Sequence, residues 1–354
     1  RLSSTFLADL SHDMHYLPFF PLLLITLHRA TRDARHLRCL SQSVAALAEM
    51  PAWQRNAGYD FVLALGYDKP WERREEVYHI QNYDPRLTNV LVLSTHDSFF
   101  GDRHALFYAS QGGAAYRNIR NVVVPLPFTL NCSSWRRAVD RRRQRGAPRF
   151  RVSFAGSLNG PTRTLIAAAA ARLRGSLPES EGAALGVRFV TNDSDRRTLS
   201  EQPALGLAGL FGGGVSSFGD LLGQSQFCLV LPGDVSDLAL RFWHALSVGC
   251  RPVVVGGPGA SIAVPFAGRL PYERIAHFAT VHDVDEAVEL LRGLLAQPSE
   301  PPVREGAERH LADMAGLFTA HAGCSFPSGE PYLGLLAKEL EDRARTWTSL
   351  RWLN

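Results

Sequence analysis

Residues 225–256 of this 354-residue chain read SQFCLVLPGDVSDLALRFWHALSVGCRPVVVG, and they decide its fold class. The apolar run 227–231 is short and ends at a Pro-Gly pair, as expected of a buried parallel strand. Apolar residues recur at helical spacing over 237–248, and Gly249 stands where a helix end favours a left-handed residue. Residues 252–255 give a second buried strand. The stretch predicts a strand–loop–helix–strand unit, whose loop lies where parallel sheets bind ligands.

The alternation of strands and helices continues on both sides of this unit and predicts an α/β fold. Further strands are expected at 60–65, 89–94, 122–126, 150–154 and 187–191, and helices at 34–50, 162–174, 219–224, 281–295, 304–318 and 331–345. Residues 135–149 are rich in arginine and lack apolar periodicity, so we interpret them as a solvated crossover between two domains. The expected domains are 1–134 and 150–300, with C-terminal helices in 301–354 that pack back on the structure.

The composition is that of an ordinary globular protein, with 45% hydrophobic and 20% charged residues. A net charge of +4 is too small to require a polyanionic partner, so we expect no nucleic-acid ligand. The five cysteines show no C-x-x-C spacing, which argues against a zinc site. Cys228 and Cys250 fall on neighbouring predicted strands, and we interpret them as buried small apolar residues.

The 225–256 stretch resembles the core signature of the exostosin-like glycosyltransferases. In that family a Phe-Cys-Leu strand precedes a Pro-Gly loop, and an Arg-x-x-x-Ala helix leads to Gly-Cys-x-Pro-Val. Arg241 and Ala245 match the helix, and residues 249–253 match the closing motif. The family usually carries Glu or Asp immediately before that alanine, whereas this chain has His244.

Other segments resemble the same family in the same order, so that the resemblance covers roughly residues 8–300. Residues 50–64 are similar to its Pro-x-Trp helix and following strand, and residues 121–125 occupy the place of Asp-Val-x-x-Pro. Phe154-Ala155-Gly156 followed by Arg163 resembles the Phe-Ala-Gly … Arg motif that opens the nucleotide-binding half.

The resemblance implies a GT-B-like fold, in which two Rossmann-like domains face each other across a cleft. Residues 1–134 would form the acceptor side and residues 150–300 the nucleotide-sugar-binding side. The implied activity is inverting transfer of a sugar from a UDP-sugar to a polysaccharide or glycoprotein acceptor, with no cofactor or metal required. The alternative is a non-catalytic exostosin-like protein that serves as a binding or scaffold subunit in a larger assembly, with His244 as the mark of lost chemistry.

A nucleotide-sugar site must hold a diphosphate, which backbone amides at helix N-termini and arginine forks bind well. Two loops would form a diphosphate clamp facing one cleft: 156–160, before the helix that carries Arg163, and 232–234, before the helix that carries Arg241. Arg163 and Arg241 would each contribute a cation to this clamp, unless both pair with carboxylates at the surface. His244 would contact donor hydroxyls in place of the family's acid. The donor-binding candidates are Gly156, Ser157, Arg163, Gly233, Asp234, Arg241 and His244.

The catalytic base of an inverting transfer would lie on the N-terminal domain, across the cleft from the donor. His96 and Asp97 follow the predicted strand 89–94 and are the first candidates; the His12-Asp13 pair is the second. Asn131 and Asn192 begin Asn-x-Ser sequons, which suit glycosylation of a lumenal protein. The resemblance also implies a Golgi protein with an N-terminal membrane anchor. Since no window here reaches the ~20 apolar residues of a membrane span, we expect this anchor to precede the residues given.

Overall fold

The computed structural model divides the chain into two compact units. The first is Arg1–Leu126 with Ala263–Leu270 and Glu330–Asn354, and the second is Pro127–Ile262 with Pro271–Gly329. The residues that the structure describes are 15–17, 34–58, 61–64, 86, 90–94, 121–123, 140, 148–158, 160–190, 210–211, 215, 217–232, 240–256, 264, 266, 272–298, 334 and 336–342.

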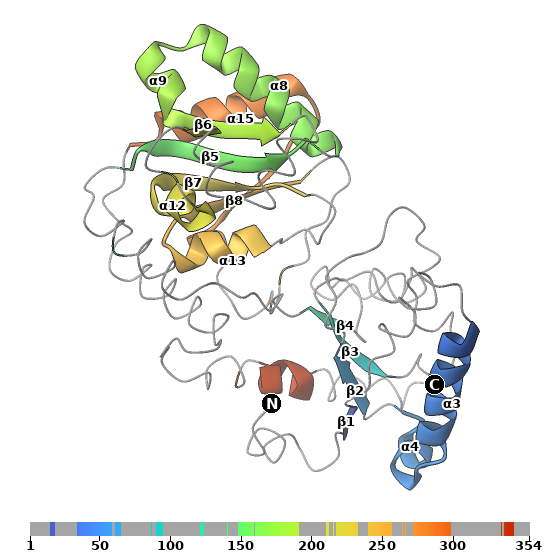
Figure 1. Cartoon of the computed structure of the whole chain (residues 1–354). Helices are drawn as coiled ribbons and strands as arrows, with labels where there is room; N and C mark the ends of the chain where they lie inside the picture. The colour runs from blue at the N-terminus through green and yellow to red at the C-terminus, as the bar shows by residue number, and fades with distance from the viewer. Residues whose placement is uncertain are drawn as a thin grey trace. The chain divides into compact units, whose positions relative to one another are not determined.

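The first unit contains a parallel sheet with the strand order β1-β2-β3-β4 (Figure 1). Its strands are β1 (His15–Leu17), β2 (Phe61–Ala64), β3 (Leu91–Ser94) and β4 (Asn121–Val123), and its helices are α3 (Ala34–Ala48) and α4 (Pro51–Asn56). The buried Trp53 ring lies 4.9 Å from the Phe61 ring, between centroids. Gly58 joins α4 to β2 at φ 84°, and a Cβ there would lie 2.7 Å from the Trp53 ring, so glycine is required at this turn.

The second unit contains a parallel sheet with the order β6-β5-β7-β8-β9, covered by helices on both faces (Figure 1). Helices α8 and α15 pack against one face, and α12 and α13 lie on the other. The strands are β5 (Phe150–Ser157), β6 (Leu185–Val190), β7 (Ser225–Val230), β8 (Arg251–Gly256) and β9 (His277–Thr280). The helices are α8 (Pro161–Ser176), α9 (Glu179–Ala184), α12 (Phe218–Gly223), α13 (Leu240–Ser247), α14 (Tyr272–Ile275) and α15 (Val284–Ala296).

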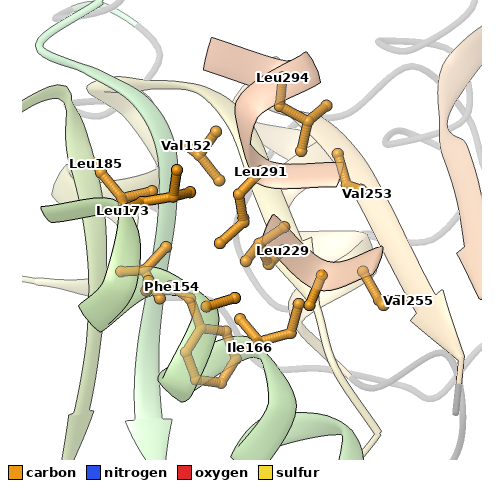
Figure 2. Close-up of a cluster of buried hydrophobic side chains, with 14 of the residues drawn as sticks. Val152, Phe154, Ile166, Leu173, Leu185, Leu229, Val253, Val255, Leu291 and Leu294 are labelled. Atoms are coloured by element: carbon orange, nitrogen blue, oxygen red, sulfur yellow. The ribbon is translucent and has the colours of Figure 1, made fainter. Parts of the chain in front are cut away.

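The core of the second unit lies between the sheet and the helices α8 and α15 (Figure 2). Val152, Leu229 and Val253 from three adjacent strands meet Ile166 of α8 and Leu291 of α15, and all five side chains are at most 2% exposed. Burying each such side chain stabilises the fold by about 1.5–3 kcal/mol. Strands covered on both faces must be apolar throughout, which explains the uninterrupted runs in the sequence.

The α/β class with parallel sheets is confirmed, and so are the strand, helix and following strand of the 225–256 stretch, as β7, α13 and β8. Helix α13 ends as its sequence predicts, with Gly249 at φ 76°. The amide of Gly249 donates to Leu246 O (3.0 Å) and that of Cys250 donates to Ala245 O (2.9 Å), the paired bonds of a Schellman motif.

Two interpretations at strand ends were wrong. Gly156 and Ser157 do not begin a loop after a strand ending at residue 154; they are the last residues of β5, because β5 stays paired with β6 as far as Ser157 and Val190. Cys228 and Cys250 are not separate apolar side chains but form a disulfide, with their Cα atoms 6.0 Å apart.

The helix end explains the disulfide. In the β7–β8 register Cys228 faces Pro252, and the Schellman turn returns the chain so that Cys250 comes within disulfide reach of β7. Both cysteines are buried, whereas Cys39 on α3 is an exposed free thiol.

The expected elements agree with the described ones to within a few residues, apart from four that were missed: β1, α9, β9 and α14. The expected helix 304–318 lies outside the described residues, and of 331–345 the structure describes residues 334 and 336–342, which are helical. Among the described helices, none has the length and apolar character needed to cross a bilayer.

Candidate functional site

The candidate site lies at the carboxyl ends of β5 and β7, which are adjacent parallel strands of the second unit. The carboxyl end of β5 carries Gly156 and Ser157, and β7 continues into Leu231 and Pro232. Such an edge, where strands lead into helices, is the usual ligand position in parallel sheets.

Arg163, on the first turn of α8, connects the two strand ends. Its Nε donates to Pro232 O at 2.9 Å, and one terminal nitrogen donates to Ser157 O at 3.0 Å and to Ser157 Oγ at 3.3 Å. The residue is 7% exposed, and its Cζ lies 5.6 Å from the centroid of the Phe154 ring. Arg163 is therefore not a surface arginine: it is buried, and it joins the end of β5 to Pro232, which lies 69 residues beyond Arg163 in the sequence.

Arg241, near the start of α13, also contacts the carboxyl end of β5. Its guanidinium donates to Ala155 O, and its Cζ lies 4.6 Å from the Phe154 centroid and 5.8 Å from the Phe218 centroid. The residue is partly exposed. Within the described part of the chain, none of the ion pairs involves Arg241.

The environment of Arg241 disfavours its positive charge. Burial, and next the charge of Arg163, lower the pKa of Arg241 to about 9, so it stays cationic at neutral pH. Two guanidinium groups thus face the Phe154 ring and repel each other. An anion bound beside Arg241 would offset that repulsion and accept charge-assisted hydrogen bonds.

His244 lies one turn after Arg241 on α13. Burial, and next the positive charge of Arg241, lower the pKa of His244 to about 4. The imidazole is therefore neutral at physiological pH and does not neutralise Arg241, as a carboxylate at this position would. A neutral imidazole carries one ring N–H donor and one ring acceptor, either of which suits a ligand hydroxyl.

The N-terminus of α8 adds backbone donors to this edge. Its first turn holds no acidic residue, and no described side chain caps it. The backbone amides of a helix's first turn bind anions, and they act here beside the Arg163 side chain.

The structure brings Gly156, Ser157, Arg163, Arg241 and His244 into one region of the second unit. Sequence reasoning missed Phe154 as the ring that both guanidiniums face, although it stands two residues before Gly156 in the same motif.

Several predicted site residues cannot be placed. Gly233, Asp234, His96, Asp97, Asn131 and Asn192, and the second base pair His12-Asp13, lie outside the described residues. Within the described part of the chain, no group of three or more His, Cys, Asp or Glu side chains is placed to hold a metal ion.

Comparison with protein families shows a match to the exostosin GT47 domain over residues 11–294. The chain belongs to the exostosin GT47 family. The resemblance found in its motifs is thereby confirmed, and the match spans both parallel sheets. A comparison with curated proteins found no match.

Solved structures similar to this exostosin-family chain include two enzymes of trehalose phosphate metabolism. The N-terminal domain of trehalose-6-phosphate phosphatase from Candida albicans is 8% identical, with a TM-score of 0.40, and the match covers 80% of this chain and 64% of that one. The α,α-trehalose 6-phosphate synthase from Burkholderia multivorans is 13% identical, with a TM-score of 0.36, and 83% and 66% are covered. The chain thus spans slightly less than two thirds of the length of these two chains.

Proposed function

We propose that this exostosin-family protein transfers a sugar from a nucleotide diphosphate sugar, and specifically a UDP-sugar, to a polysaccharide or glycoprotein acceptor with inversion. The observation that carries the proposal is Arg241, a partly exposed cation beside a second guanidinium, with no ion-pair partner among the described residues. Membership of a glycosyltransferase family supplies the reaction class.

In this proposal the donor's diphosphate binds between the start of α8 and Arg241. The first-turn amides of α8 and the Arg241 fork donate to phosphate oxygens, and Arg163 holds the two strand ends that frame them. His244, neutral at physiological pH, hydrogen-bonds a hydroxyl of the donor.

The chemical role of Arg241 follows from where charge develops. As the bond from the sugar carbon to the diphosphate breaks, negative charge grows on the leaving oxygen, and a fixed cation stabilises that charge more than it stabilises the bound donor. The acceptor hydroxyl loses its proton to a base, for which His96 and Asp97 remain our candidates across a GT-B-like cleft. We propose that the reaction needs no metal or cofactor.

We further propose that the protein works in the Golgi lumen, held by an N-terminal membrane anchor, and that Asn131 and Asn192 are glycosylated there. The Cys228–Cys250 disulfide supports an oxidising compartment, because disulfides persist in secretory compartments and are rare in the cytosol.

A second candidate function is a scaffold subunit that kept the fold and lost the chemistry. The observation that favours it is His244, whose neutral ring cannot replace both acceptor oxygens of the family's acid. The two functions differ in whether the protein binds a nucleotide.

Isothermal titration with a panel of UDP- and GDP-sugars tests the proposal. We expect UDP-sugars to bind below millimolar concentration and Arg241→Ala to weaken binding by about 10- to 100-fold, the effect of losing a charge-assisted contact worth roughly 1.5–3 kcal/mol. Arg172→Ala is the matched control, because it removes an exposed arginine of the same unit that pairs with the exposed Asp285, and it should leave binding unchanged. If no nucleotide binds below millimolar concentration, the catalytic interpretation is wrong.

A further inference from the structure

Gly156 is in direct contact with the Arg241 side chain. A Cβ at Gly156 would lie 2.7 Å from one terminal nitrogen of Arg241 and 3.2 Å from the other, and 3.1 Å from Cζ of Phe154. Real Cβ atoms essentially never approach another heavy atom to 2.7 Å. The space that a side chain would take at position 156 is therefore occupied by the Arg241 guanidinium.

Backbone conformation does not require glycine at this position. Gly156 lies within β5, paired with Phe189 of β6, and it is not among the residues with positive φ. Any residue can adopt this extended backbone. A Cβ at this position would therefore act chiefly on Arg241, whose guanidinium is the end of a flexible side chain and would have to move aside.

The contact also determines where the charge of Arg241 lies. The guanidinium passes over Gly156 to donate to Ala155 O, the carbonyl of the preceding residue, while it rests on the Phe154 ring. A side chain at position 156 would push the guanidinium away from this carbonyl and from the ring.

We propose that Gly156 is a positioning residue: its missing side chain allows Arg241 to dock on the end of β5 and so places the cation that receives the donor's diphosphate. This inference rests on the proposed function and deepens it. Gly156 would act by positioning Arg241, and its own backbone amide would not need to donate to the phosphate.

A double-mutant cycle on the intact chain tests the inference, with Gly156→Ala, Arg241→Ala and the double variant. The unfolding free energy from urea denaturation and the UDP affinity from isothermal titration are measured for each. Gly186→Ala is the matched control: it lies in β6 of the same sheet, and its Cβ would meet the Phe150 ring at the same 2.7 Å, away from Arg241.

We expect Gly156→Ala to lower stability in the wild-type background and to do so much less in the Arg241→Ala background, where only the milder contact with Phe154 remains. UDP affinity should fall about tenfold in Gly156→Ala, while the double variant binds no more weakly than Arg241→Ala alone. Gly186→Ala should lower stability and leave UDP affinity unchanged.

Equal destabilisation by Gly156→Ala in both backgrounds would overturn the inference, as would additive losses of UDP affinity, since Gly156 would then act independently of Arg241. If Gly156→Ala does not fold, a folded double variant supports the inference and an unfolded one refutes it. A wild-type protein that binds no UDP would refute the proposed function, whereas the stability cycle would still decide whether Gly156 positions Arg241.

Discussion

The pH dependence of stability gives a direct test of the environment assigned to His244. Burial and the nearby charge of Arg241 lower the pKa of this histidine from 6.5 to about 4 in the folded protein. Between these two values the unfolded chain binds a proton at position 244 that the folded protein excludes. The contribution of His244 to stability is therefore complete above pH 6.5 and is lost as the pH falls towards 4.

The size of this loss follows from the shift. Each unit of pKa corresponds to about 1.4 kcal/mol, so His244 should account for about 3 kcal/mol of lost stability between pH 6.5 and 4. His244→Gln, which stays neutral at every pH, should lack this component. Burial is the larger cause, so Arg241→Ala should reduce the component without abolishing it.

The assay is urea denaturation at intervals between pH 4 and 8 for the wild type, His244→Gln and Arg241→Ala. The difference in unfolding free energy between the wild type and His244→Gln isolates the histidine from the carboxylates that titrate in the same range. If this difference stays constant from pH 8 to pH 4, His244 titrates alike in both states and the assigned environment is wrong.

Three further variants test other contacts of the site. Arg163→Ala should lower the unfolding free energy by about 2 kcal/mol in urea titrations, because the partly buried Ser157 and Pro232 carbonyls lose a charged donor. Arg163→Lys should not restore the lost stability, because an ammonium lacks the guanidinium fork, and full rescue by lysine would contradict the connecting role. Replacing Cys228 and Cys250 together by alanine should lower the unfolding free energy by about 3 kcal/mol, the chain-entropy value for a crosslink over 22 residues. The comparison is wild-type protein in reductant, which should melt at the same temperature as the variant. His244→Glu should lower the rate of sugar transfer about tenfold, because the new carboxylate would form an ion pair with Arg241. Transfer is measured with labelled donor, with His244→Gln as the control. A gain in donor binding would instead indicate that the site had decayed and would favour the scaffold function.

The central strands were predictable because burial on both faces demands apolar residues and leaves no alternation to interpret. β9 was not predicted because it is short and lies at the sheet edge. Its exposure does not follow hydrophobicity there, since His277 and Ala279 are less exposed than Phe278 and Thr280. The end of β5 escaped for a different reason: an Ala-Gly-Ser sequence has low strand propensity, and only its pairing with β6 keeps it extended.

The candidate site was predictable in its residues and not in its contacts. The motif identified Arg163 and Arg241 as candidates. No sequence pattern shows, however, that Arg163 donates to the carbonyls of Ser157 and Pro232 or that the Arg241 guanidinium lies against Gly156. The contacts of Arg163 with Pro232 and of Arg241 with Ala155 join residues 69 and 86 positions apart, and they exist only once the strand register is set. The disulfide was missed for the same reason, since it depends on how the turn after α13 returns to the sheet.

The electrostatics of the site bear on the choice between enzyme and scaffold. Arg163 and Arg241 repel each other, and His244 is neutral at physiological pH, so it does not relieve that repulsion. None of the ion pairs among the described residues involves Arg241, so a scaffold that binds no anion would keep this repulsion within the described part of the chain, and replacing Arg241 by a neutral residue would remove it. In a donor-binding protein a bound diphosphate relieves the same repulsion. The two charges therefore lower the stability of the free protein and raise its affinity for the diphosphate. Affinity should therefore depend on phosphate charge, with UDP binding more tightly than UMP and UMP more tightly than uridine, and the differences should shrink as salt screens the site. Equal affinity for UDP and uridine would mean that the diphosphate does not contact these arginines.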